Sequence, residues 1–165
     1  MKTLYIVRHA KSSWDDPSLA DFDRPLNSRG RRDAPRMGKR LKEQNILPDL
    51  IFSSPAKRAL STAKRIAEEL GYSKHAIETN EDLYHASEEE ILSVLQGFSD
   101  KHSAVLMVGH NPGLTDFVNA LMNLNIFNIP TCGIATCSLD VSSWKEIEFG
   151  KGINVFYDFP KSKDD

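Results

Sequence analysis

The sequence has few of the features that mark secreted, membrane-spanning or metal-binding proteins. Its 165 residues include two cysteines, Cys132 and Cys137, and no C-x-x-C or H-E-x-x-H spacing. No apolar run is long enough to cross a bilayer, and residues 1–7 lack the apolar stretch and cleavage site of a signal peptide. We therefore predict a cytoplasmic protein without metal or cofactor, in which both cysteines are buried as small hydrophobic residues.

The chain also lacks the positive charge of a nucleic-acid-binding domain. Its net charge is −2, and this charge is spread unevenly. Residues 1–65 carry 15 basic and 7 acidic side chains, whereas residues 66–165 carry 6 and 16. The net charge argues against binding to nucleic acid. The basic first part suits an anionic ligand, although many of its charges crowd one predicted helix and are expected to form a solvated face.

Strand-like and helix-like segments alternate along a single predicted domain, residues 1–160, which is followed by a frayed tail, residues 161–165. Alternation of this kind predicts an α/β fold with a largely parallel sheet covered by helices on both faces. The predicted strands are 3–7, 49–53, 77–80, 103–108 and two or three late ones near 134–141, 145–149 and 153–159. The predicted helices run from Asn27 or Ser28 to Gln44, from Ser54-Pro55 to Gly71, from Ser87 to Gly97, and from Asn111-Pro112 to Leu124.

Three strand ends carry residues suited to phosphate. They are Arg8-His9-Ala10, the segment from Ser54 to Arg58, and Gly109-His110-Asn111. The carboxyl ends of parallel strands meet at one edge of a sheet, where ligands bind in open α/β folds. Helix N-termini follow two of these segments and favour an anion. We therefore expect two histidines and two arginines to converge on one hollow.

These residue types suit phosphoryl transfer. Arg8 and Arg58 offer forked donors that match phosphoryl oxygens, and His110 can donate a further hydrogen bond. His9 is the predicted nucleophile, kept neutral by the neighbouring arginine charge. The following loop adds Trp14, which either contacts a partner or packs the loop. Further predicted phosphate or substrate contacts are Lys11, Ser12, Arg24 and Asn111, and Arg24 either reaches the pocket or pairs with Asp21 or Asp23.

These motifs resemble those of the histidine phosphatase superfamily, which includes the cofactor-dependent phosphoglycerate mutases. Arg8-His9-Ala10 resembles its R-H-G signature, Ser54-Pro55-x-x-Arg58-Ala59 its second arginine motif, and Gly109-His110-Asn111 its second histidine motif. The small size, Asp23-Arg24-Pro25-Leu26 with Gly30, and Gly109–Pro112 resemble the SixA-type phosphohistidine phosphatase branch. The resemblance extends over most of the chain. It implies a three-layer α/β/α sandwich like that of phosphoglycerate mutase, a transient phosphohistidine at His9, and no metal.

The sequence departs from the superfamily pattern at two places. Ala10 replaces the glycine of the signature, and Leu83-Tyr84-His85-Ala86 has no carboxylate where larger relatives carry one. The general acid is therefore unassigned, with four nearby candidates: Glu81, Asp82, His85 and Glu88. Because an imidazole leaves more readily than an alkoxide, a site without a placed acid favours phosphohistidine or another P–N substrate.

Other functions remain open at this point. The first alternative is a small-molecule phosphomonoesterase or mutase of the same superfamily, and the second is a non-catalytic phosphate-binding module. A cysteine nucleophile is not expected, because neither cysteine is followed by an anion-binding loop and an arginine. An aspartyl nucleophile is not expected because Asp21-Phe22-Asp23 does not follow a strand. We predict a monomer whose partner is a phosphorylated protein or a small phosphorylated substrate, with no nucleic acid and no membrane.

Overall fold

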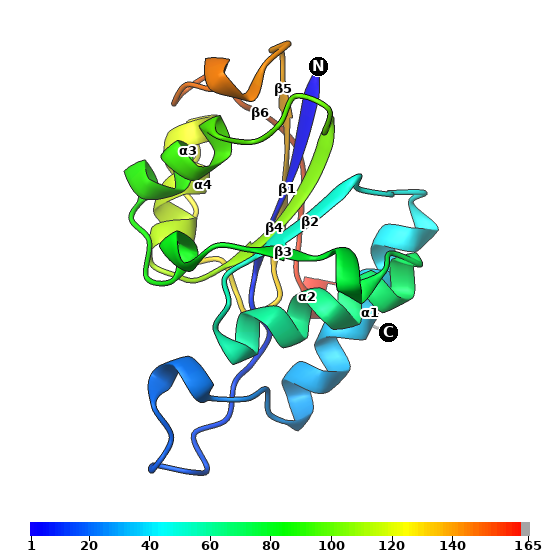
Figure 1. The fold of residues 1–165 in the computed structure, drawn as a ribbon, viewed down its shortest axis with the longest axis vertical. Coiled ribbons are helices and arrows are strands. Elements are labelled where there is room, and N and C mark those ends of the chain that lie inside the picture. Colours follow the sequence, from blue (N-terminus) through cyan, green and yellow to red (C-terminus); the bar gives the residue numbers. More distant parts are fainter. Residues whose placement is uncertain (163–165) are drawn as a thin grey trace.

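The computed structural model describes residues 1–162, which form one six-stranded sheet and four α-helices (Figure 1). The strands are β1 (Lys2–Arg8), β2 (Leu50–Ser53), β3 (Glu78–Thr79), β4 (Ala104–Gly109), β5 (Ile134–Leu139) and β6 (Ile153–Asp158). The helices are α1 (Ser28–Glu43), α2 (Lys57–Leu70), α3 (Glu88–Gln96) and α4 (Gly113–Met122). This arrangement confirms the predicted α/β class.

The strand order explains why three distant segments meet. The order is β3-β2-β4-β1-β5-β6, and β3, β2, β4 and β1 run parallel. Of the strands described, only β5 runs against them, because β5 is antiparallel to β1 and β6 is antiparallel to β5. Arg8 at the end of β1 lies opposite Gly109 at the end of β4, and Ser53 at the end of β2 lies opposite Val108. The residues after β1, β2 and β4 therefore leave the sheet at the same edge, as the sequence predicts.

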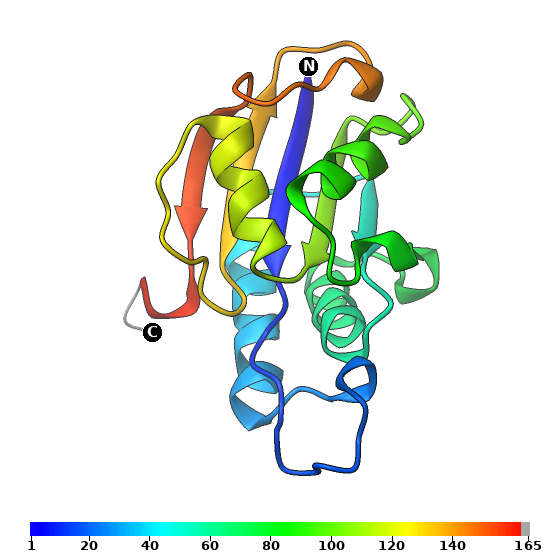
Figure 2. The same cartoon turned by 90° about the vertical axis from the view of Figure 1, so that its left-hand side faces the viewer.

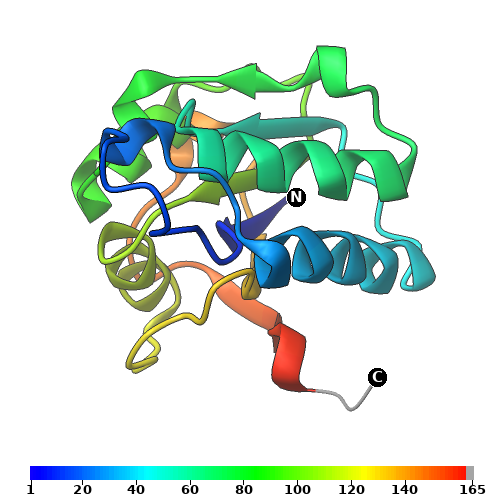
Figure 3. The same ribbon diagram turned by 90° about the horizontal axis from the view of Figure 1, so that it is seen from below.

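Helices cover both faces of the sheet, which gives the three predicted layers (Figures 2 and 3). The apolar side chains of α1 and α2 pack with one set of sheet residues, including Ile51 and Leu106. Those of α3 and α4 pack with the alternate set, including Leu4 and Met107. Central strands that are buried on both faces account for the uninterrupted apolar runs in the sequence. Cys132 and Cys137 lie in these two cores as buried free thiols, as predicted.

Most helix signals in the sequence are confirmed. Asn27 caps α1 by accepting a hydrogen bond from the Gly30 amide, and the helix continues through Pro35. Gly71 ends α2 in the left-handed conformation that glycine favours. Ser87 and Glu90 form the predicted capping box at the start of α3.

Two predicted helix starts and one predicted helix end are wrong. The helix after Ser54-Pro55 begins at Lys57 without a side-chain cap, because the Ser54 hydroxyl is hydrogen-bonded to His110 and to the Ala56 amide. The helix after Asn111-Pro112 begins at Gly113, one residue later than predicted, and Asn111 Oδ1 accepts from the amide and hydroxyl of Thr115, the third residue of the helix. That helix ends at Met122, because the next residue, Asn123, has a left-handed backbone.

The predicted late strand at 145–149 is not a strand. Trp144–Glu146 forms a 3₁₀ turn capped by Ser143, and the turn buries Trp144 and Ile147 three residues apart. At the C-terminus, Pro160–Ser162 forms a 3₁₀ turn, and the rest of the predicted tail, residues 163–165, lies outside the described residues. Within residues 1–162, no helix has the length and apolar character needed to cross a membrane.

Candidate active site

The four residues predicted to form the site come together at the carboxyl ends of β1, β2 and β4. The His9 and His110 rings lie 5.2 Å apart between centroids. Arg58 comes from the first turn of α2, and Arg8 is the last residue of β1. His9, Arg58 and His110 are each at least 93 % buried. The loop of residues 10–27, dark blue in Figure 2, extends from this edge of the sheet.

The hydrogen bonds of His9 determine which ring nitrogen can react. Its Nδ1 lies 2.7 Å from the carbonyl oxygen of Ala10, which can only accept, so Nδ1 carries the proton. The Ala10 amide in turn donates to Thr62 Oγ1 at 2.9 Å, which fixes this stretch of backbone. Ala10 is fully buried and does not adopt a left-handed backbone, so alanine fits here in place of glycine. The neutral ring therefore has its lone pair on Nε2.

The surroundings of His9 keep its ring neutral. Burial, together with the positive charges of Arg58, Arg8 and Arg24, lowers the pKa of His9 to about 4 against the opposing hydrogen bond to Ala10. Burial and the neighbouring His9 and Arg58 likewise lower the pKa of His110 to about 3. The predicted effect of arginine charge is thus present, but burial is the larger cause. A neutral imidazole at physiological pH is the form that can attack phosphorus.

Three buried nitrogens of the predicted site have no hydrogen-bond partner within the described chain. They are Arg8 Nε, Arg58 Nε and His110 Nδ1. The remaining groups are held in place: Arg8 Nη1 donates to the Ile129 carbonyl at 2.8 Å, and His110 Nε2 lies 2.8 Å from Ser54 Oγ. Unsatisfied buried donors cost free energy unless a ligand accepts from them. His110 Nδ1 is a donor when the Ser54 hydroxyl donates to His110 Nε2, and an oxyanion that reached these nitrogens from beside His9 would supply the missing acceptors.

Asp21 pairs with Arg24, one of the alternatives that the sequence left open, and it makes contacts with Arg58 and Tyr84 that sequence reasoning missed. Its Oδ2 accepts hydrogen bonds from Arg58 Nη2 at 3.0 Å and from the Tyr84 hydroxyl at 2.5 Å, and its carbonyl accepts from Arg58 Nη1 at 2.7 Å. Burial alone would raise the pKa of Asp21, but the bonds from Tyr84 and Arg58 hold it well below its usual range. Asp21 is therefore a permanent carboxylate that orients Arg58.

The loop residues predicted to bind phosphate divide into two groups. Arg24 is buried, donates to Ser12 Oγ at 2.7 Å and to Asp21 Oδ1 at 3.1 Å, and stacks on Trp14 at 3.6 Å. Ser12 and Arg24 thus belong to the Asp21 network, and Trp14 covers Arg24 while itself staying 72 % exposed. The Lys11 side chain is exposed and has no hydrogen bond or ion pair within the described chain.

The side-chain amide of Asn111, predicted to contact phosphate, is hydrogen-bonded to other residues of the chain. Its Nδ2 donates to Asn128 Oδ1 at 2.8 Å and to the Ile129 carbonyl at 3.1 Å, while its Oδ1 accepts from Thr115. The Ile129 carbonyl also accepts from Arg8. Asn111 therefore ties α4 to the segment that positions Arg8.

Of the four candidates for a general acid, the structure brings His85 nearest to the site. Its ring lies 6.1 Å from His110, and its Nε2 lies 3.5 Å from Asp21 Oδ2. Glu81, Asp82 and Glu88 have no hydrogen bond or ion pair with the site residues within the described chain. Residues 1–162 contain no group of three or more His, Cys, Asp or Glu placed to hold a metal ion.

The sequence matches the profile of the histidine phosphatase superfamily (branch 1) over residues 4–87. An uncharacterized chloroplastic protein of Arabidopsis thaliana is 32 % identical over 153 residues, which are 88 % of this chain and 70 % of that protein. The chain belongs to the histidine phosphatase superfamily.

Structural comparison places the chain with the SixA-type members of this superfamily. A structure assigned to SixA of Agrobacterium tumefaciens is similar with a TM-score of 0.82 and 27 % identity, covering 96 % of this chain and 98 % of that one. A phosphoglycerate mutase of Bifidobacterium longum is 40 % identical over 62 residues, 36 % of this chain and 25 % of the mutase. The SixA-type likeness thus spans the fold, whereas the mutase likeness spans one segment.

Proposed function

We propose that this protein is a metal-independent phosphatase that removes the phosphoryl group from phosphohistidine in a protein, through a phosphohistidine formed at His9. The observation that carries the proposal is the pairing of a buried, neutral His9, its lone pair on Nε2, with three buried donors that lack a protein partner. Such donors stabilise the charge that spreads over the phosphoryl oxygens during transfer.

The proposed reaction has two steps. In the first, His9 Nε2 attacks the phosphorus, the P–N bond to the substrate imidazole breaks, and the released imidazole takes a proton from solvent. In the second, water attacks the phosphorus of phospho-His9, the bond to Nε2 breaks, and inorganic phosphate leaves. Arg8, Arg58 and His110 donate to the phosphoryl oxygens in both steps. The hydrogen bond from Nδ1 to the Ala10 carbonyl keeps the reactive nitrogen in place.

The preference for a P–N substrate follows from the proton donors at the site. Asp21 is the carboxylate bound to Arg58, and its pKa is held well below the usual range, so it is a poor acid at neutral pH. A substrate that leaves as imidazole needs little help from an acid. The similarity to the SixA structure, assigned as a phosphohistidine phosphatase, supports the same substrate class. Cytoplasmic location and a monomeric state remain predictions from the sequence.

The experiment is phosphate release from a histidine-phosphorylated protein, compared with hydrolysis of p-nitrophenyl phosphate. We expect His9→Asn to abolish both activities, while the matched variant of an exposed histidine, His75→Asn, keeps both. A chelator should change neither rate. Full activity of His9→Asn would refute the nucleophile, and loss of activity with chelator would refute metal independence.

The relative rates decide the substrate class. Faster turnover of an alkyl phosphate than of phosphohistidine would favour the small-molecule phosphomonoesterase or mutase alternative. Binding of phosphate without turnover of any substrate would favour the alternative of a non-catalytic phosphate-binding module.

A further inference from the structure

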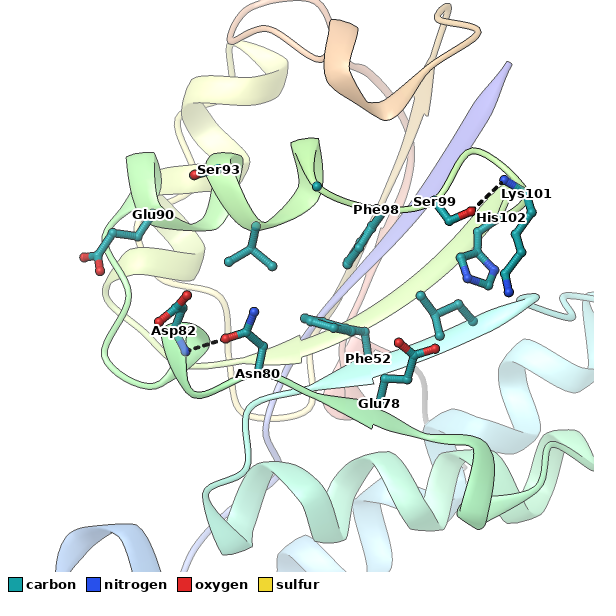
Figure 4. Close-up of a pocket in the computed structure, with 13 residues that line it drawn as sticks. Phe52, Glu78, Asn80, Asp82, Glu90, Ser93, Phe98, Ser99, Lys101 and His102 are labelled. Carbon is teal, nitrogen blue, oxygen red and sulfur yellow. Dashed lines mark hydrogen bonds between the residues drawn. The ribbon is translucent and has the colours of Figure 1, made fainter.

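A groove of about 680 Å³ lies between α3 and the β2–β3 edge of the sheet (Figure 4). None of the four residues of the phosphate site lines it. Its floor is apolar and is formed by Leu50, Phe52, Val94 and Phe98, with the two phenylalanine rings in edge contact at 4.8 Å between centroids. A floor of this kind can accept an apolar side chain from a partner.

The rim of the groove carries mostly negative charge. Asp82 and Glu90 lie at the end opposite Lys101 and His102, and Glu78 lies beside Phe52 (Figure 4). Within residues 1–162, none of the three carboxylates forms an ion pair. They belong to the part of the chain, residues 66–165, that carries 6 basic and 16 acidic side chains. A rim of this sign attracts a basic partner and repels an acidic one.

The groove is connected to the phosphate site through two short segments. The amide of Asn80, which lines the groove, donates to the Ser53 carbonyl at 3.3 Å, and the next residue, Ser54, is hydrogen-bonded to His110. Asp82 lies in the 3₁₀ turn Glu81–Leu83, which ends at Tyr84, so the two residues are separated by a rise of only about 4 Å, and Tyr84 donates to Asp21. A peptide whose phosphorylated side chain reaches His9 would therefore pass close to the Asp82 end of the groove.

We propose that this groove docks a segment of the phosphoprotein substrate in which a lysine or arginine stands beside an apolar side chain. The inference rests on the proposed function and adds the sequence context of the substrate to it. The phosphate site would take the phosphoryl group, and the groove would take a neighbouring part of the same polypeptide. Affinity for the segment would come from apolar contact with the partly exposed Val94 and Phe98, and selectivity from the carboxylates.

The test uses two phosphohistidine peptides that differ only in their flanking residues, one with lysine and leucine and one with glutamate and leucine. Glu78→Lys reverses a charge on the rim, and Glu68→Lys on α2, across the sheet, makes the same change in net charge. We expect kcat/KM of Glu78→Lys for the basic peptide to fall about fivefold, the size of one exposed ion pair. For the same peptide, kcat/KM of Glu78→Gln should fall less, and kcat/KM of Glu68→Lys should equal that of the wild type.

Two controls separate this inference from the proposed function. Hydrolysis of p-nitrophenyl phosphate by Glu78→Lys should equal that of the wild type, which shows that the site is intact. Binding of the unphosphorylated basic peptide, measured by fluorescence anisotropy, should weaken in Glu78→Lys without any turnover. The proposed docking role of the groove would be overturned if Glu68→Lys lowered kcat/KM for the basic peptide as much as Glu78→Lys does. It would also be overturned if wild type and Glu78→Lys bound the unphosphorylated peptide equally well. Peptide binding at the groove without hydrolysis of either phosphohistidine peptide would instead overturn the proposed function.

Discussion

The proton affinity of His9 gives a direct physical test of its assignment as the nucleophile. Burial and the nearby arginines lower its pKa to about 4, whereas an ordinary histidine titrates near 6.5. At pH 5, about one His9 ring in ten should carry a second proton, compared with about 97 % of ordinary histidines. His9 should therefore stay able to attack phosphorus at a pH where an ordinary histidine cannot.

The same shift makes the stability of the protein depend on pH. The unfolded chain binds a proton at His9 below about pH 6.5, whereas the folded chain does so only near pH 4. The free energy of unfolding should therefore decrease as the pH falls through this window and level off below it. A pKa difference of this size corresponds to roughly 3 kcal/mol. His9→Gln should remove this contribution and reduce the pH dependence, while His110, whose pKa is also lowered, keeps its own contribution.

Two measurements test this prediction. Heteronuclear NMR of labelled histidine follows the ring of His9, assigned by comparison with His9→Gln and His110→Gln. Urea unfolding between pH 4 and pH 7 gives the free energy of unfolding of wild type and His9→Gln. A His9 signal that titrates near pH 6.5, or equal pH slopes for the two proteins, would refute the reasoning.

Further substitutions test the parts of the site separately. Asp21→Asn removes the charge that pairs with Arg58, so we expect kcat/KM for p-nitrophenyl phosphate to fall about tenfold. The free energy of unfolding should fall by about 1 kcal/mol. Arg58→Lys removes the planar fork, and steady-state kinetics should show kcat/KM about a hundredfold lower with the fold intact. Gly113→Ala would place a Cβ 1.8 Å from the Ala86 carbonyl oxygen, so urea unfolding should show a free energy of unfolding lower by about 2 kcal/mol or more. The control is Gly97→Ala, whose Cβ would have its nearest contact at 3.4 Å and which should lower this free energy by less than about 1 kcal/mol.

The centre of the site could be predicted because it depends on strand direction. The apolar runs now seen as β1, β2 and β4 are parallel neighbours, so whatever follows each run must lie at one edge of the sheet. That rule alone predicts that His9, Arg58 and His110 lie close together. The late region was harder, because Ile147 and Phe149 alternate with charged residues as in a strand, whereas Ile147 is buried three residues after Trp144 at the end of a 3₁₀ turn.

The contacts of Asp21 with Arg58 and Tyr84 could not be predicted, because nothing local determines them. Asp21 lies in a long loop without apolar periodicity, and it meets Arg58 and Tyr84 from 37 and 63 residues away. The one signal in the sequence was its position three residues before Arg24, a spacing that lets the two side chains pair across a turn. Contacts between polar side chains of distant loops depend on the completed fold.

The helix caps show why the local rules fail at this site in particular. Ser54-Pro55 and Asn111-Pro112 are strong start signals, yet neither side chain caps a helix in the predicted way. Ser54 holds the His110 ring, and Asn111 joins α4 to the carbonyl that holds Arg8. Ser54 is thus used to orient His110, while Asn111 both accepts from the Thr115 amide near the start of α4 and fixes the carbonyl that holds Arg8. Departures from a local rule are expected where a side chain serves a site, so these two departures themselves support placing the site here.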